Sequence, residues 1–177
     1  IFAIGKGDIL VGRTEYCTYP QVVLQVPTIG SIMEPNIEKI VEIMPDLVFA
    51  SSIVPLEAVE QLRSLGIQVV SMKNEESFDS TYNTILDLGY ILGAQEQADL
   101  IVKEMQEEVK YITEKVSNAP KVSTYYVIAY GEYGDYTPGG GTFINDVITM
   151  AGGINIASDM EGWKYSKEKL IEQDPDI

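Results

Sequence analysis

Histidine is absent from this sequence of 177 residues, and cysteine, tryptophan and basic residues are scarce. Without histidine, these residues cannot supply histidine metal ligands, a Ser-His-Asp triad or a histidine general base. The single Cys17 excludes an internal disulfide and indicates no redox compartment. Paired carboxylates occur in many places, but none stands with a nucleophile and a base in a recognisable order, so we find no catalytic motif.

Positive charge and long hydrophobic runs are also lacking. Twelve basic residues stand against 27 acidic ones, and the net charge of −15 repels phosphates, so we expect no nucleic-acid partner. No apolar run approaches the roughly 18 to 20 residues that span a bilayer. The first residues lack the basic region and cleavage site of a signal peptide, so we expect any targeting segment to be upstream or absent.

Short apolar runs alternate with longer stretches of helical periodicity, which is typical of an α/β protein. We expect strands at residues 9–12, 47–51, 67–72 and 122–129. We expect helices from Asn36, as N-cap, to Pro45 and from Pro55 to Gly66. The order strand, helix, strand predicts parallel neighbours joined by right-handed crossovers.

A longer helix is predicted over residues 94–118, which contain neither glycine nor proline. Its apolar face consists of Ile101, Met105, Val109, Ile112 and Val116. A helix of about 22 residues spans roughly 33 Å, more than a small α/β crossover needs. We interpret it as a connector between two lobes; the alternative is a long helix packed on a single sheet.

An internal repeat favours two lobes. Residues 36–47, "NIEKIVEIMPDL", align without gaps to residues 166–177, "SKEKLIEQDPDI". We therefore expect an N-terminal lobe at 1–93, the connecting helix at 94–118 and a C-terminal lobe at 119–177. Because "PDI" corresponds to the entry into a strand, and "IFAIGKGD" to the end of a helix, we expect both ends to be truncated and the second lobe to be incomplete.

Tyrosines and glycines gather in "YGEYGDYTPGGGTF", which follows the predicted strand 122–129 and precedes a helix that Thr142 can cap. A phosphate loop at Gly139–Gly141 is one interpretation, but no lysine or arginine lies between Lys121 and Lys164. A flexible turn is another. Aromatic rings at the carboxyl end of a strand suit a large planar ligand, and the glycines would free the loop to approach it.

Taken together, several segments resemble the class III substrate-binding proteins of ABC importers, the cobalamin, haem and ferric-siderophore group. The segments are "GDILVGRTEYCTYP", "NIEKIVEIMPDLVFAS", "EAVEQLRSLGIQVV", "GGGTFINDVITMAGGINIA" and "WKYSKEKLIEQDPDI". The resemblance covers nearly the whole chain. It implies two Rossmann-like lobes with parallel sheets, joined by one long helix, that hold a ligand between them and catalyse nothing.

The resemblance also implies roles for individual residues. The ligand-binding residues would be Tyr16, Tyr19, Ser51, Ser52, Tyr130, Tyr133, Tyr136 and Trp163. Glu57 and Glu168 would dock onto arginines of the permease, with Glu57 matching the family pattern within one residue. For the tyrosines and Trp163, surface loops or simple packing are open alternatives, and for the two glutamates the helix macrodipole alone is a sufficient reason.

The implied protein is an extracytoplasmic monomer that reaches the membrane only through a lipid anchor or the permease. It has no resident cofactor or metal site, although its ligand can contain iron or cobalt. The missing histidines disfavour metal-ion binding proteins and histidine-held haem, whereas tyrosine-held haem stays open. Two rivals remain: a cytosolic α/β enzyme binding a phosphorylated or nucleotide substrate at Gly139–Gly141, and a sensor domain within a larger chain.

Overall fold

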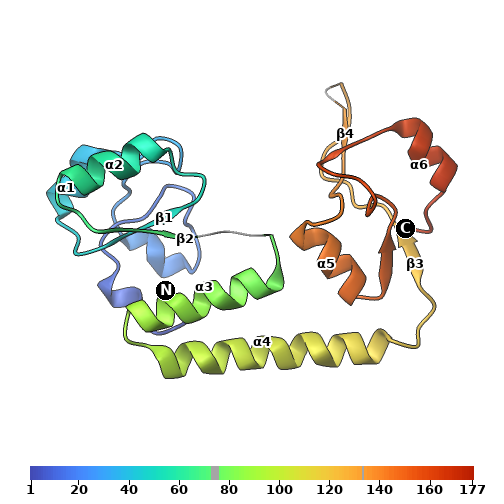
Figure 1. Ribbon diagram of the computed structural model, residues 1–177, viewed down its shortest axis with the longest axis horizontal. Coiled ribbons are helices and arrows are strands. Elements are labelled where there is room, and N and C mark those ends of the chain that lie inside the picture. Colours follow the sequence, from blue (N-terminus) through green and yellow to red (C-terminus); the bar gives the residue numbers. More distant parts are fainter. Residues whose placement is uncertain (73–75, 133) are drawn as a thin grey trace. The chain divides into compact units, whose positions relative to one another are not determined.

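A computed structural model describes residues 1–72, 76–132 and 134–177 (Figure 1). The chain divides into two compact units. Unit 1 comprises Ile1–Asn74 and Tyr82–Ile101, and unit 2 comprises Glu75–Thr81 and Val102–Ile177. Each unit contains a parallel pair of strands with helices, so the predicted α/β class is confirmed. Among the described residues, no helix is both long and apolar enough to cross a membrane.

Unit 1 is built on the parallel strands β1 (Val48–Ser51) and β2 (Val69–Met72), which pair from Val48 opposite Val69 to Ser51 opposite Met72. Helix α2 (Leu56–Ser64) makes the crossover between them and buries Val59 and Leu62. Helix α1 (Ile37–Ile43) precedes β1 and contacts α2. The strands and helices that the sequence predicts between residues 36 and 72 are therefore confirmed.

The strand predicted at residues 9–12 is wrong. The chain instead forms the 3₁₀ helix η1 (Gly7–Ile9), and a second 3₁₀ helix, η2 (Gln21–Gln25), follows later. Just after the predicted strand, Arg13 makes a single bridge with Thr28. The Arg13 N–H donates to the Pro27 carbonyl at 3.0 Å, and its carbonyl accepts from the Ile29 N–H at 2.9 Å. Among the described residues, the pairing with residues 27–29 is confined to Arg13, so residues 9–12 do not form a strand.

Two helices follow β2. Helix α3 (Phe78–Ile91) was not among the predicted elements, whereas α4 (Gln95–Val116) is the predicted long helix, with 22 residues. Gly89 of α3 approaches α4 so closely that an added Cβ would lie 2.4 Å from the Ala98 Cβ. The division between the units falls inside α4, after Ile101. The first turn of α3 belongs to unit 2, where the Phe78 ring stacks on the Phe143 ring with centroids 4.6 Å apart.

Unit 2 contains the parallel pair β3 (Val122–Thr124) and β5 (Gly153–Asn155), connected through α5 (Phe143–Met150). The predicted cap is present, because the Thr142 hydroxyl accepts from the Asn145 N–H at 3.2 Å. A short antiparallel pair consists of β4 (Asp135–Tyr136), which lies between β3 and α5 in the sequence, and β6 (Lys164–Tyr165), which follows β5. The predicted strand 122–129 is too long, since its pairing with β5 ends at Thr124.

The internal repeat is reproduced in the structure by α1 and α6 (Lys167–Gln173). Each helix has seven residues and begins at a side-chain N-cap, Asn36 or Ser166, that accepts from the N–H three residues later. Each ends at a non-glycine residue in the left-handed region, Met44 with φ 50° or Asp174 with φ 39°. After α6, Ile177 bonds to one edge of β3: it donates to the Ser123 carbonyl and accepts from the Tyr125 N–H. The "PDI" segment thus lies beside β3, and the matching "PDL" segment of the first copy directly precedes β1.

Candidate functional site

The loop that carries Tyr16 and Tyr19 lies in unit 1, directly after Arg13. A turn shapes it, because the Cys17 N–H donates to the Thr14 carbonyl at 3.1 Å, and the Tyr19–Pro20 peptide is cis. The two rings have little packing around them: Tyr16 is 75% exposed and Tyr19 is 90% exposed. Both phenol rings are available to a ligand.

The second predicted segment of unit 1 is the carboxyl end of β1, the end of a parallel strand where α/β proteins bind ligands. Ser51 is the last residue of the strand and is half-buried, while Ser52 is exposed in the following turn, which the Val54 N–H closes by donating to the Ser51 carbonyl. Glu57 follows in the first turn of α2 and is exposed. Its carboxylate stands near the positive end of the helix macrodipole, which stabilises a negative charge.

In unit 2, the backbone of Tyr136 lies between two other segments that carry predicted site residues, one with Tyr130 and one with Trp163. On one side, the Tyr136 N–H donates to the carbonyl of Ala129, the residue before Tyr130, at 2.8 Å. On the other side, Tyr136 pairs with Lys164, the neighbour of Trp163. Tyr130 is 83% exposed, Trp163 is 38% exposed and Tyr136 is half-buried. Tyr133 lies outside the described residues.

The glycine run does not act as the sequence suggested. The N–H groups of Gly139 and Gly140 donate to the carbonyls of Gly162 and Met160, at 3.2 and 3.0 Å. A Cβ at Gly139 would lie 2.3 Å from the Met160 oxygen, and a Cβ at Gly140 would lie 2.3 Å from the Ser158 oxygen. The expectation that these glycines free a loop is therefore wrong: they allow two backbone segments to touch. Two N–H groups that a phosphate would need are already used.

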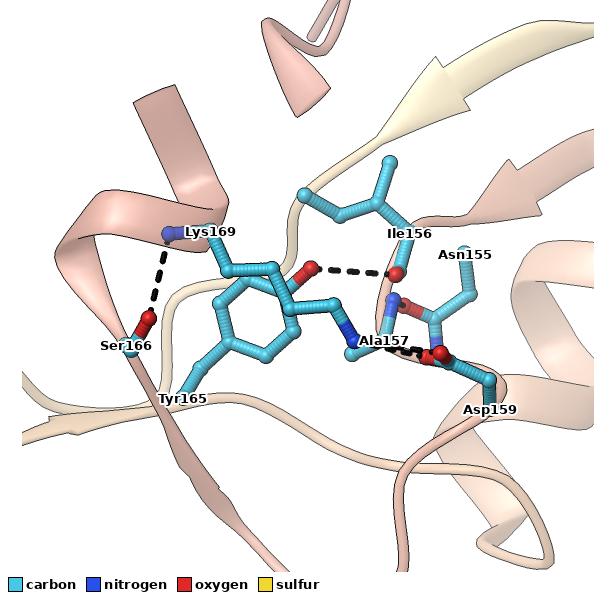
Figure 2. A network of polar contacts seen from close by, with 7 residues as sticks. All are labelled: Asn155, Ile156, Ala157, Asp159, Tyr165, Ser166 and Lys169. Atoms are coloured by element: carbon cyan, nitrogen blue, oxygen red, sulfur yellow. Dashed lines mark hydrogen bonds and ion pairs between the residues drawn. The ribbon is translucent and has the colours of Figure 1, made fainter. Parts of the chain in front are cut away.

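Helix α6 starts in a network of polar contacts (Figure 2). The Lys169 ammonium donates to both carboxylate oxygens of Asp159, at 3.2 and 3.1 Å, and lies 5.4 Å from the centroid of the Tyr165 ring. The hydrogen bond to Asp159 raises the pKa of Lys169. Burial raises the pKa of the Tyr165 phenol, whose hydroxyl donates to the Ile156 carbonyl at 3.2 Å. Glu168 lies between Tyr165 and Lys169 in the sequence, in the first turn of α6, and is exposed.

Asn155 is a buried residue of this region that the sequence reasoning missed. Its side-chain amide donates to the Pro138 carbonyl at 2.8 Å and to the Asn145 side-chain oxygen at 3.1 Å. Its own side-chain oxygen accepts from the Ala157 N–H at 3.0 Å (Figure 2). One amide therefore fixes β5 to α5 and to the segment before the glycines. The signal was a single polar residue inside the apolar run "GINIA".

The groups at the predicted positions are suited to binding. Exposed aromatic rings supply flat apolar contact with a polar tip, and serine hydroxyls supply hydrogen bonds. Within the described ranges, no group of three or more Cys, Asp or Glu side chains could hold a metal ion.

Comparison with known proteins defines the family. The periplasmic binding protein family matches residues 1–177. The chain belongs to this family. The sequence-based resemblance to solute-binding proteins is therefore confirmed.

Three relatives illustrate the match. An ABC transporter substrate-binding lipoprotein of Bacillus subtilis, YvrC, described as uncharacterized, is 33% identical over 99% of this chain and 57% of its own length. A cobalamin-binding protein of Halobacterium salinarum is 31% identical over 100% of this chain and 49% of its own. The periplasmic heme-binding protein RhuT from Roseiflexus sp. RS-1, solved in apo form, is 25% identical with a TM-score of 0.87, over 99% of this chain and 69% of that one. The chain spans about half the length of the curated relatives.

Proposed function

We propose that this chain belongs to an extracytoplasmic solute-binding protein that captures a metal chelate and delivers it to an ABC permease. The ligand class comprises haem, cobalamin and ferric siderophores. The observation that carries the proposal is the set of highly exposed tyrosines, Tyr16, Tyr19 and Tyr130, on loops of a periplasmic binding protein. Relatives named for cobalamin and heme support the ligand class. The protein binds and releases its ligand unchanged.

Aromatic contact would supply most of the affinity. A buried aromatic side chain contributes roughly 150–250 Å² of contact, so a few rings can cover much of a porphyrin or corrin face. The proposed ligand-binding set is the one predicted from the sequence: Tyr16, Tyr19, Ser51, Ser52, Tyr130, Tyr133, Tyr136 and Trp163. Any iron or cobalt would arrive inside the ligand, and haem iron could be held by a tyrosine because the chain has no histidine.

Docking to the permease would use the acidic residues that open α2 and α6. Glu57 and Glu168 are exposed, one in each unit, and neither makes an ion pair within the described residues. Unpaired surface carboxylates are available to cationic partners, and such contacts weaken as ionic strength rises. We propose a monomer that meets the membrane through the permease or a lipid anchor, with lobes at 1–93 and 119–177.

The test is a titration of the full-length protein with haemin, cyanocobalamin, a ferric hydroxamate siderophore and ATP. Binding is monitored by the fluorescence of Trp163 and by the melting temperature. A ligand at about 100 times its dissociation constant adds roughly 2.7 kcal/mol of stability. Stabilisation by a chelate supports the proposal. Stabilisation by ATP alone would favour the phosphate-binding enzyme, and no response to any chelate would contradict the proposal.

A matched pair of variants tests the tyrosine loop. Tyr16 and Tyr90 have almost equal exposure, 75% and 74%, but Tyr90 lies on α3. We expect Tyr16→Ala to weaken chelate binding and Tyr90→Ala to leave it unchanged. Equal affinities for the two variants would remove Tyr16 from the site.

A further inference from the structure

The guanidinium of Arg13 bonds to backbone carbonyls around the tyrosine loop. Its Nε donates to the Val26 carbonyl at 3.1 Å. Its Nη1 donates to the carbonyls of Thr14, Glu15 and Cys17, at 3.1, 3.4 and 3.2 Å. Arg13 makes no ion pair with any described carboxylate, although the chain has 27 acidic residues. Its hydrogen-bonding capacity is therefore directed at the backbone.

These bonds fix the shape of the loop from inside. Carbonyl dipoles that converge on one point repel one another. A cation placed between them attracts each carbonyl oxygen and so offsets that repulsion. Hydrogen bonds from a charged donor are stronger than neutral ones, and the rigid fork of arginine can hold several acceptors in one geometry. The loop's own backbone bonds, from Cys17 to Thr14 and from Glu15 to Gly30, are compatible with the same shape.

We propose that Arg13 is a positioning residue that holds residues 14–19 in the conformation in which Tyr16 and Tyr19 meet the ligand. This inference rests on the proposed function, in which the two tyrosines contact a chelate. Because Tyr16 and Tyr19 are 75% and 90% exposed, their own packing can do little to orient them. The backbone must do so, and the Arg13 side chain bonds to three carbonyls of the loop and to that of Val26 outside it.

Loss of the guanidinium would leave the loop sampling several shapes. Apparent affinity falls in proportion to the fraction of molecules in the binding-competent shape, so a competent fraction of about 0.1 weakens binding roughly tenfold. The loss should appear as slower association, because the ligand contacts in the bound state are unchanged.

The experiment compares Arg13→Met with Arg63→Met in the full chain. Arg63 is the matched control, since its guanidinium also donates to a backbone carbonyl of unit 1, that of Val69 at 3.0 Å, away from the tyrosine loop. The first readout is amide hydrogen exchange without ligand. We expect exchange of the Glu15 and Cys17 N–H groups, which are the hydrogen-bonded amides of residues 14–19, to accelerate at least tenfold in Arg13→Met, while β1 stays protected, and to be unchanged in Arg63→Met.

The second readout is the association rate of haemin and of cyanocobalamin, whichever binds the unmodified protein. We expect slower association for Arg13→Met alone. Arg13→Lys separates geometry from charge: a lysine keeps the positive charge without the fork, so we expect it to behave like Arg13→Met. Full recovery of the association rate in Arg13→Lys would overturn the positioning role and indicate simple charge attraction.

The two proposals can fail separately. Unchanged exchange in residues 14–19 overturns the role of Arg13, whatever the ligand does. Accelerated exchange that includes β1 also overturns it, because the residue would then support the whole unit. If exchange accelerates only in the loop and the unmodified protein binds no chelate, Arg13 shapes the loop as proposed and the ligand class is wrong.

Discussion

The carboxylate of Asp176 accepts two hydrogen bonds from Ser123, one from its N–H at 2.9 Å and one from its hydroxyl at 2.6 Å. In return, the Asp176 N–H donates to the Ser123 hydroxyl oxygen at 2.9 Å. These bonds join the segment after α6 to β3 and lower the pKa of Asp176 below its ordinary value of 3.8, chiefly through the side-chain bond.

The first prediction concerns the charge of Asp176. Because its pKa is lowered in the folded state, its stabilising effect is present above the ordinary pKa and is lost as pH falls through the folded one. We expect Asp176→Asn to lower the melting temperature at pH 7, and the difference from the unmodified protein to shrink once pH falls below 3.8. Thermal melts between pH 2 and pH 7 would measure this. Asp46→Asn is the control, since Asp46 occupies the matching position of the first copy and is exposed; an equal effect there would contradict the prediction.

The second prediction concerns a buried hydroxyl. Thr137 is fully buried, and its hydroxyl has no hydrogen-bond partner within the described ranges. Valine has nearly the same shape without the hydroxyl, so Thr137→Val should raise the free energy of unfolding by about 1 kcal/mol. Thr142→Val makes the same chemical change at a buried hydroxyl that caps α5, and should lower it by about 1 kcal/mol. Urea denaturation would give both values, and a loss of stability in Thr137→Val would show that its hydroxyl is satisfied.

The third prediction tests the contact between the glycine run and residues 158–162. An alanine Cβ at Gly140 would lie 2.3 Å from the Ser158 carbonyl oxygen, so the backbone would have to move apart. We expect Gly140→Ala to lower the free energy of unfolding by about 1–3 kcal/mol. Gly141→Asn should be tolerated better, because no atom lies within 4 Å of its added Cβ and asparagine accepts a φ of +76°. Equal tolerance at both positions in urea melts would contradict the close contact.

The fourth prediction concerns Asn155. Removal of its amide leaves the Pro138 carbonyl and the Ala157 N–H without their side-chain partner, so Asn155→Ala should cost about 3 kcal/mol. Asn145→Ala removes only one bond of this set and should cost less. Urea denaturation followed by Trp163 fluorescence would rank the variants. The reverse ranking would show that Asn145, and not Asn155, holds the region together.

Local signals predicted much of the fold. α1, α2 and α5 were predicted because periodic apolar residues stood beside caps or helix stops such as Asn36, Gly66 and Thr142. α4 was predicted from its apolar face and from the absence of glycine and proline over residues 94–118. The strand expected at residues 9–12 failed because an apolar run forms a strand only when a partner strand exists, and local sequence does not contain that information.

The site was predicted less completely. Tyrosine is visible in a sequence, so Tyr16, Tyr19 and Tyr130 could be named, and their exposure is consistent with ligand contact. Arg13 was missed because its partners are backbone carbonyls, which no residue type reveals. The glycine run was misinterpreted because close contact with residues 158–162 and loop freedom both favour glycine.

The matching corners of α1 and α6 give this protein an internal comparison. Both helices end at a non-glycine residue with positive φ, Met44 in one copy and Asp174 in the other. The same glycine substitution can therefore be made twice in one molecule, at two equivalent turns in different surroundings. Whatever the two measurements share belongs to the turn itself, and whatever separates them belongs to the neighbourhood in which each copy folds.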